Sequence, residues 1–236
     1  MSSEPLYHAI LFDMDGVIID TRAPIMAFWN ELAAAHGITL TAQDFERDIH
    51  GCLPTRTLDR FFPHLAPAEQ AAALEHLDVV ERNQSYRAIP GALALLAALK
   101  ARSIPTALVT SANQSKVGAV SGQLRLDGLF TIYVTSEEIT HGKPAPDAYL
   151  RAAQRLNKSP LNCVVFEDAV SGVQAATAAG TRCIGVQSPE FAPALLAAGA
   201  AHVIPDFKEV RLKTDCAGAF VCLELGSGVE SKLLFG

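Results

Sequence analysis

Lysine does not occur before Lys100, and the five cysteines of this 236-residue chain include no Cys-x-x-Cys pair. Two of the cysteines, Cys163 and Cys183, sit in apolar runs, and the total is odd. Both facts argue against a disulfide framework or a zinc site and favour buried free thiols. The apolar runs are too short to span a bilayer, and no basic segment followed by an apolar stretch opens the chain. We therefore expect a cytoplasmic protein with no membrane partner.

Positive charge is also scarce. The chain has 19 Lys and Arg against 25 Asp and Glu, which gives a formal net charge of -6. An acidic surface repels nucleic acids, so none is expected as a partner. Hydrophobic residues make up 50% of the chain, enough for one sizeable core, or for a core with a smaller domain. We expect a monomer.

What the chain does contain is an alternation of short apolar runs and helical stretches. Such alternation predicts an α/β fold, a Rossmann-like, doubly wound parallel sheet with helices on both faces. In the glycine-rich tail after about Asp215, the apolar run Phe220–Leu225 predicts an edge strand. The other strands are expected at His8–Phe12, Thr106–Val109, Thr131–Val134, Cys163–Phe166, Cys183–Val186 and His202–Ile204. Helices are expected at Gly91–Arg102, Gln114–Leu124, Asp147–Leu156 and Val170–Ala179.

One stretch breaks the alternation. Residues 22–88 carry helical signals, among them a capping-box pattern at Thr41, and no convincing strand. We predict an all-helical cap domain of residues 22–88 inserted into a core domain of residues 1–21 and 89–236. Hinges are expected near Thr21 and Ile89–Gly91, and helices within the cap at Ala27–His36 and Pro67–Tyr86.

The first strand ends in two carboxylates. Asp13 and Asp15 follow the apolar run, and Gly16 permits a tight turn directly after them. Carboxyl ends of parallel strands face the crevice in which α/β proteins bind ligands. On a continuing strand the two acids would point the same way, as a pair of catalytic or metal-binding groups. A turn with a capping aspartate is the alternative, and this motif alone does not separate the two.

Polar residues also gather at other strand ends and loops of the predicted sheet. Hydroxyls and free backbone N–H groups before a helix suit phosphate, although Ser and Thr are also common helix caps. A lysine in a proline-stiffened loop is held in place, although an isolated loop lysine is usually only solvated. The residues are Thr110, Ser111 and Asn113 after the second strand, Lys143 between two predicted elements, and Glu167 with Asp168 after the fourth strand.

Taken together, these segments place four carboxylates at one edge of the sheet. Carboxylates that lie so close together repel one another, and some are forced to bind protons unless a cation joins them. Oxygen ligands without histidine or cysteine favour a hard ion, above all Mg²⁺. Carboxylates, a cation, a lysine and hydroxyls are what phosphoryl transfer requires, and an aspartate can be its nucleophile. The sequence thus predicts a magnesium-dependent enzyme that acts on a small phosphate ester.

The same segments resemble the four motifs of the haloacid dehalogenase superfamily, in the branch that carries a helical cap after the first motif. They occur in the family's order and cover nearly the whole chain to about Leu212. The motifs are Asp13-Met14-Asp15-Gly16-Val17, Thr110-Ser111, Lys143-Pro144 and the six residues from Glu167 to Gly172.

This resemblance implies a role for each motif residue. Asp13 attacks phosphorus, and Asp15 protonates the leaving alcohol and then activates water. Thr110 and Lys143 hold the phosphoryl oxygens, with Ser111 and Asn113 as further phosphate-binding candidates. The Mg²⁺ ligands implied are Asp13, the main-chain carbonyl of Asp15, Asp168, and Glu167 directly or through water.

Within this branch, the chain is most similar to phosphatases of small polyols and sugars, of the glycerol-phosphate and 2-deoxyglucose-6-phosphate type. On that likeness His50 and Gly51 lie on the cap loop that faces the substrate, with Arg56 just after them. A surface or core histidine without function is an equally good interpretation of His50. The segment Cys52–Thr55 is longer than the family's usual spacing, which leaves the place of Arg56 open.

Three alternatives are weighed against a phosphatase. A sugar phosphomutase of the β-phosphoglucomutase type carries a histidine in the first cap helix, where this chain has Ile25. A phosphonate hydrolase uses a cap lysine, and none precedes Lys100. A catalytically silent binding module on the same fold would have lost a motif residue, and none is lost. The second acid, Asp15, also argues against carbon–halogen cleavage, because the true dehalogenases of the superfamily lack it.

Overall fold

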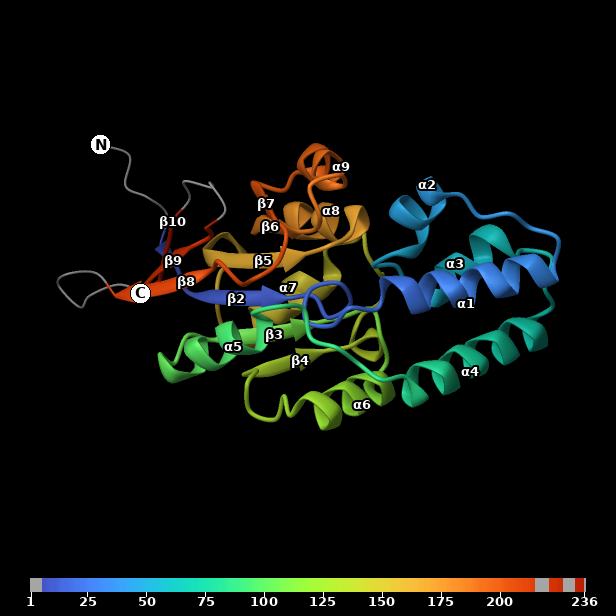
Figure 1. The fold of residues 1–236 in the computed structure, drawn as a ribbon, viewed down its shortest axis with the longest axis horizontal. Coiled ribbons are helices and arrows are strands. Elements are labelled where there is room, and N and C mark those ends of the chain that lie inside the picture. The colour runs from blue at the N-terminus through green and yellow to red at the C-terminus, as the bar shows by residue number, and fades with distance from the viewer. Residues whose placement is uncertain (1–5, 215–220, 227–231, 236) are drawn as a thin grey trace.

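The computed structural model describes residues 6–214, 221–226 and 232–235. Figure 1 shows an α/β body with a group of helices at one end of it. The body is built on a six-stranded sheet of order β4-β3-β2-β5-β6-β7, in which every neighbouring pair is parallel. The predicted α/β class is confirmed. Its strands are β2 (Ala9–Phe12), β3 (Thr106–Val109), β4 (Ile132–Val134), β5 (Cys163–Glu167), β6 (Arg182–Val186) and β7 (His202–Ile204).

Helices cover both faces of this sheet because alternate side chains of each strand point to opposite faces. In β2, Ile10 and Phe12 pack with the helices of one face, while Ala9 and Leu11 pack with those of the other. The first face is covered by α5 (Ala92–Ala101) and α6 (Gln114–Leu124). The second face is covered by α7 (Asp147–Arg155), α8 (Val170–Ala178) and α9 (Ala192–Ala198).

The central strand β2 lies between β3 and β5, with Phe12 opposite Leu108 on one side and Phe166 on the other. The residues that follow these three strands therefore come out at the same edge. The chain runs from β2 outward in both directions along the sheet, so this edge is the switch point at which α/β folds bind ligands. In Figure 1 the carboxyl ends of the strands face the group of helices.

That group consists of four helices and a π-helical turn, with its own apolar core around Phe28, Trp29 and Phe62. Pro67 occupies the first turn of the longest helix, where its missing N–H is tolerated. The predicted capping box is present, since Thr41 and Asp44 each accept a bond from the other's backbone N–H. The elements are α1 (Arg22–Ala35), α2 (Ala42–Asp44), the π turn Phe45–Ile49, α3 (Pro54–Phe61) and α4 (Pro67–Asn83).

Two segments connect the helical group to the body, and they run side by side. Asp20 N donates to Arg87 O, and Ile89 N donates to Ile18 O, each over 2.9 Å. The paired crossing lies where the sequence predicted hinges. The division into a core of residues 1–21 and 89–236 and a cap of residues 22–88 stays a prediction, and "cap" below refers to residues 22–88.

The tail of the chain corrects one expectation. The run Phe220–Leu225 was expected to give an edge strand, and Phe220 lies outside the described residues. The strand in this run is β9, which is instead an interior strand of a separate sheet of order β1-β10-β9-β8. Leu223 and Leu225 of this run are buried against the core. The strands are β1 (Leu6–Tyr7), β8 (Arg211–Thr214), β9 (Val221–Glu224) and β10 (Lys232–Phe235).

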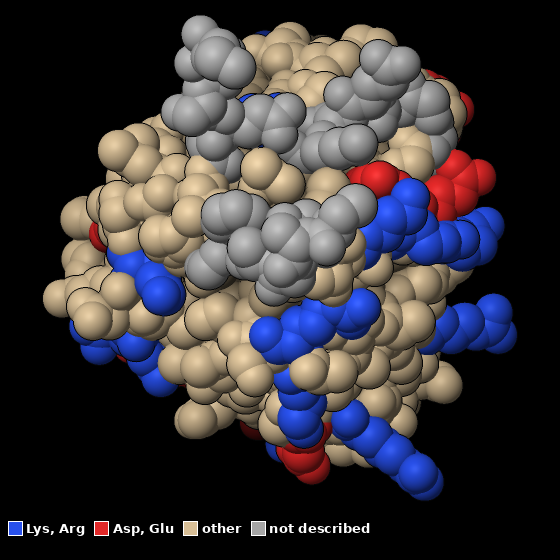
Figure 2. All heavy atoms as spheres, turned by 90° about the vertical axis from the view of Figure 1, so that its left-hand side faces the viewer, with Lys and Arg blue, Asp and Glu red and all other residues tan. Residues whose placement is uncertain are grey.

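This second sheet lies at the end of the body away from the cap (Figure 1). Figure 2 shows Lys and Arg side chains spread over that face, so the acidic excess of the chain is not displayed there. The thiols of Cys163 and Cys183 are free and buried, as predicted, while Cys216 lies outside the described residues. Within the described part of the chain, every helix is too short or too polar to cross a membrane.

Candidate active site

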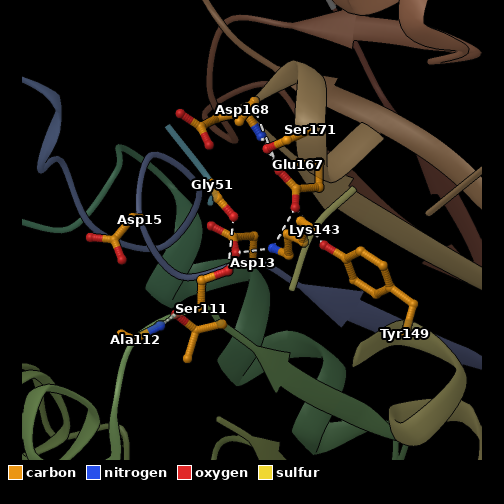
Figure 3. Close-up of polar contacts among 12 residues, drawn as sticks. Asp13, Asp15, Gly51, Ser111, Ala112, Lys143, Tyr149, Glu167, Asp168 and Ser171 are labelled. Carbon is orange, nitrogen blue, oxygen red and sulfur yellow. Dashed lines mark hydrogen bonds and ion pairs between the residues drawn. The ribbon is translucent and has the colours of Figure 1, made fainter. Parts of the chain in front are cut away.

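The centre of the site is a lysine held between two carboxylates. Asp13 directly follows β2, Glu167 is the last residue of β5, and Lys143 reaches both from the loop before α7 (Figure 3). Lys143 Nζ donates to Asp13 Oδ1 over 2.5 Å and to Glu167 Oε1 over 2.6 Å. The hydroxyl of Tyr149 also donates to Glu167 Oε1, over 2.6 Å. All four side chains are buried, so the ammonium of Lys143 is fixed in place.

Charge is not balanced in this cluster. Burial alone would lower the pKa of Lys143, but Asp13 and Glu167 raise it, so its amine is a cation. Burial raises the pKa of Asp13 well above its usual value, and Glu167 and Asp168 add to that while Lys143 opposes it. Burial also raises the pKa of Asp168 to about 7, together with Glu167 and against Arg22. The ammonium of Lys143 and the guanidinium of Arg22, which is paired with Asp168, are two positive charges against three buried carboxylates, and a further cation would compensate the remainder.

These acids fit a hard metal ion. Among the described residues, one group could hold a metal: Asp13, Glu167 and Asp168 each offer an oxygen, all within 4.8 Å of one another. Glu167 is already engaged, since its Oε1 accepts from Lys143 and Tyr149 and its Oε2 from the backbone amides of residues 168 and 169. Asp13 and Asp168 are therefore better suited to direct ligation, and Glu167 to holding Lys143.

Asp15 does not join this cluster, which corrects the expectation that it points the same way as Asp13. The strand ends at Phe12, and Gly16, at φ 76°, turns the chain so that its N–H bonds the carbonyl of Ile19. The Asp15 carboxylate is consequently turned away from Asp13 (Figure 3). Glycine is required here for a second reason, because a Cβ on Gly16 would lie 2.1 Å from the Asp168 carboxylate.

The Asp15 carboxylate is held by two donors, neither of which was predicted from the sequence as a site residue. Its Oδ1 accepts from Thr21 Oγ1 over 2.5 Å and from Lys116 Nζ over 2.8 Å. Lys116 Nζ also donates to Glu81 Oε1 of the cap helix α4, over 2.7 Å. The side chain of Lys116 is 3% exposed. The neighbouring carboxylate Asp168 has a cap partner too, because Arg22 Nη1 donates to its Oδ2 over 3.1 Å.

The three predicted residues of the polar segment after β3 make different contacts. Thr110 is buried, its Oγ1 accepts the amide of Ala112 over 3.0 Å, and it lines the cavity described below. Ser111 Oγ donates to the carbonyl of Gly51 in the cap, over 2.8 Å. Asn113 caps α6, and its Nδ2 donates to Asp78 Oδ1 of the cap over 3.0 Å. Thr110 faces the site, while Ser111 and Asn113 hold cap residues.

The cap loop of His50 and Gly51 lies on the core. Ser171 Oγ of α8 donates to the carbonyl of His50 over 2.9 Å, and a Cβ on Gly51 would come within 2.8 Å of that hydroxyl. His50 is buried, its Nε2 makes no hydrogen bond to the described residues, and burial lowers its pKa to about 3. Its imidazole is therefore neutral. Arg56 is not among the residues lining the cavity, and its Nη1 donates to the main-chain carbonyl of Lys143 over 2.9 Å.

A cavity of about 390 Å³ lies between the cap and the core, a size that suits a small ligand. Its core side is polar and contains both aspartates of the first motif. Its cap side combines an apolar wall with two carboxylates. The core residues include Asp13, Asp15, Thr110, Ser111, Asn113 and Lys116, and the cap residues include Ile25, Trp29, Ile49, His50, Gly51, Leu74, Leu77, Asp78 and Glu81.

Comparison with known families decides which enzymes share this arrangement. The family of haloacid dehalogenase-like hydrolases matches residues 7–180, which include all four motifs. The chain belongs to this family. It is 37% identical over 190 residues to hexitol phosphatase A of Escherichia coli K12, a match that covers 78% of this chain and 85% of that protein.

Two further similarities fit this family of hydrolases. The chain is 32% identical over 202 residues to the phosphorylated carbohydrates phosphatase of Thermotoga maritima, covering 83% of this chain and 93% of that protein. A crystal structure of β-phosphoglucomutase from Clostridium difficile superimposes with a TM-score of 0.74 at 25% identity, covering 87% and 94% of the two chains. The predicted family is confirmed, and the roles of individual residues stay predictions.

Site residues of this haloacid dehalogenase-like hydrolase that were missed from the sequence include Thr21, Arg22, Lys116 and Tyr149. A signal existed for Lys116, which lies in the first turn of α6. A cation there meets the positive end of the helix dipole and is unfavourable unless anions compensate it. Arg22, the first residue of α1, carries the same signal, whereas Tyr149 gave none.

Proposed function

We propose that this hydrolase is a Mg²⁺-dependent phosphatase that releases phosphate from a small sugar or polyol phosphate through an aspartyl-phosphate on Asp13. The observation that carries the proposal is the Asp13 carboxylate, fixed beside the buried ammonium of Lys143 and lining a cavity of about 390 Å³. The names of the relatives, a hexitol phosphatase and a phosphorylated carbohydrates phosphatase, support the substrate class.

The reaction has two steps. Asp13 attacks phosphorus and forms a new O–P bond while the bond to the leaving alcohol breaks, and Asp15 gives the alcohol its proton. In the second step Asp15 takes a proton from water, which attacks phosphorus and frees Asp13 and phosphate. Lys143 and Thr110 bind phosphoryl oxygens. The separation of Asp15 from the Asp13 cluster supports this division, because Asp15 acts on the alcohol and water rather than on the phosphoryl oxygens.

A metal ion has candidate ligands in Asp13, Asp168 and the main-chain carbonyl of Asp15. The fit rests on the buried carboxylates Asp13 and Asp168, whose pKa values stay raised although Lys143 and Arg22 lie beside them. When bound, the ion supplies charge neutralisation for the phosphoryl group. Glu167 contributes by orienting Lys143, or by binding the ion through a water.

The cap acts as a lid over the cavity. Main-chain carbonyls of His50 and Gly51 accept hydrogen bonds from core hydroxyls, so these contacts do not use the imidazole of His50, which lines the cavity. The neutral imidazole and the carboxylates of Asp78 and Glu81 offer partners for sugar or polyol hydroxyls. Closure would exclude bulk water while Asp13 reacts.

The test is a panel of esters: hexitol phosphates, sugar phosphates, glycerol phosphate, phosphoglycolate and nucleotides. Phosphate release from the polyol or sugar esters is expected with Mg²⁺, loss in EDTA, and recovery when Mg²⁺ is restored. Full activity in EDTA would refute the metal role. No turnover of any ester would favour a silent binding module.

A sugar phosphomutase is the second candidate, because a β-phosphoglucomutase shares the fold. Ile25, at the position where the resemblance places the mutase histidine, lines the cavity with an apolar side chain. The same panel separates the two activities, since a mutase yields isomerised sugar phosphate and little free phosphate.

A further inference from the structure

Lys116 is the buried cation that the two-step reaction above leaves without a task. It lies in α6, lines the cavity, and its side chain is 3% exposed. Its ammonium makes ion pairs with Asp15 of the core and Glu81 of the cap, over 2.8 and 2.7 Å. A buried lysine is tolerated where anions compensate its desolvation, and here the two anions belong to different parts of the molecule.

The two bonds to Asp15 have a directional consequence. Thr21 and Lys116 both donate to Oδ1, and neither uses Oδ2. A carboxylate anchored by two donors at one oxygen has its second oxygen set in a fixed direction. Asp15 lines the cavity, so Oδ2 is the oxygen available to a leaving alcohol or a water.

We propose that Lys116 is a positioning residue for leaving-group protonation. It orients the carboxylate of Asp15, and its bond to Glu81 makes that orientation depend on the presence of the cap helix α4. The inference rests on the proposed function, in which Asp15 is the acid. The Asp15–Lys116–Glu81 bridge thus orients Asp15 for proton transfer to the leaving alcohol only when the cap is closed.

A pair of substrates distinguishes this role from a structural one. Sorbitol 6-phosphate releases an alkoxide-like leaving group that needs a proton, whereas p-nitrophenyl phosphate releases a far more acidic phenol that needs little help. The value of kcat/KM covers steps only up to the first phosphoryl transfer, so it excludes the later hydrolysis that both esters share. A defect in acid positioning therefore lowers kcat/KM for the alkyl ester selectively.

The decisive variant is Lys116→Met. We expect kcat/KM for sorbitol 6-phosphate to fall roughly 100-fold, the scale of a misplaced or lost general acid. For p-nitrophenyl phosphate we expect a fall of less than about fivefold, since its leaving group needs little acid catalysis. Inhibition by inorganic phosphate should be unchanged, because Lys143 and Thr110 are untouched. Equal losses for both esters, or no loss for sorbitol 6-phosphate, would overturn the proposal.

The contribution of the Lys116–Glu81 contact is tested with Glu81→Leu. We expect this variant to reduce kcat/KM for sorbitol 6-phosphate about tenfold, and again more than kcat/KM for p-nitrophenyl phosphate. Matched controls are Lys100→Met and Glu75→Gln, both on exposed side chains, with no change expected. If Lys116→Met does not fold, the pair Lys116→Met/Glu81→Leu removes one charge of each sign and must show the same selectivity. Failure of wild type to hydrolyse either ester would overturn the proposed function and this inference together.

Discussion

The core side and the cap side of the cavity are built differently. On the core side the side chains of Asp13, Lys143 and Glu167 are 4%, 0% and 0% exposed. Each is fixed by the end of a buried strand or by a loop pressed against it. On the cap side the carboxylates of Asp78 and Glu81 are 25% and 14% exposed and come from one helix, α4. The core holds its charges out of solvent, and the cap presents its charges from one helix with part of each carboxylate in solvent.

The contacts between the two sides extend this difference. The core hydroxyls of Ser111 and Ser171 bond main-chain carbonyls of the cap loop. Any residue supplies a main-chain carbonyl, so these two bonds do not restrict the side chains of the loop, apart from the space that Gly51 needs. Under the proposed function, this arrangement combines a constant reaction centre with a replaceable specificity surface. The predictions below test it from the core outward.

The largest effect is expected at Asp13, the proposed nucleophile. Asp13→Asn should lower kcat by roughly 10⁴-fold or more, because an amide is a poor nucleophile and the remaining groups only bind and polarise. Phosphate release from sorbitol 6-phosphate measures it, and circular dichroism checks the fold. Asp127→Asn is a control outside the cavity lining. Retained activity would mean that another group attacks phosphorus.

A smaller loss of activity is expected at Glu167, which contacts Lys143 rather than the phosphoryl group. Glu167→Gln keeps the shape of the side chain but removes the charge that holds Lys143, and we expect activity and Mg²⁺ affinity to fall roughly 10- to 100-fold. Steady-state kinetics across a Mg²⁺ titration measure both. Should both stay at the wild-type level, Glu167 would be a passive core residue and the core half of the comparison would fail.

On the cap side, His50 should affect stability through pH. Its pKa is about 3 when folded, against an ordinary value of 6.5 for histidine. As pH falls from 7 to 5, the unfolded chain binds a proton that the folded chain refuses, so this group costs about 2 kcal/mol of stability. Urea unfolding of His50→Gln at both pH values should show a correspondingly smaller pH-dependent loss. His64→Gln, on the exposed cap surface, is the control; a loss equal to that of wild type in His50→Gln would place His50 in solvent.

The smallest effect is expected at Asp78. Asp78→Asn retains an oxygen for Asn113 and lies partly in solvent, so KM for a sugar phosphate should change less than about fivefold, in line with exposed ion pairs worth under about 1 kcal/mol. We expect kcat to be unchanged. Steady-state kinetics with two esters of different polyols provide the measurement. A fall in kcat comparable to that of Glu167→Gln would make the cap part of the reaction centre.

Much of this protein follows from local sequence. The apolar residues of β2 are buried on both faces and end at Asp13, and this pattern predicted a strand of a parallel sheet with a carboxylate at its carboxyl end. The same reasoning placed Lys143, Glu167 and Asp168 at one edge, where the structure gathers them. The motifs suffice for this because the period of a strand and the direction of a parallel sheet fix where strand ends meet.

Tertiary structure decided the partners of these residues. The turn at Gly16 sends Asp15 away from Asp13, and Lys116 reaches it from another helix. Arg56 faces the Lys143 loop rather than the cavity. Strand periodicity reports only which face of its own element a side chain occupies. Which distant charge meets it depends on how the cap and the sheet pack, and in a buried site that pairing sets both its orientation and its protonation.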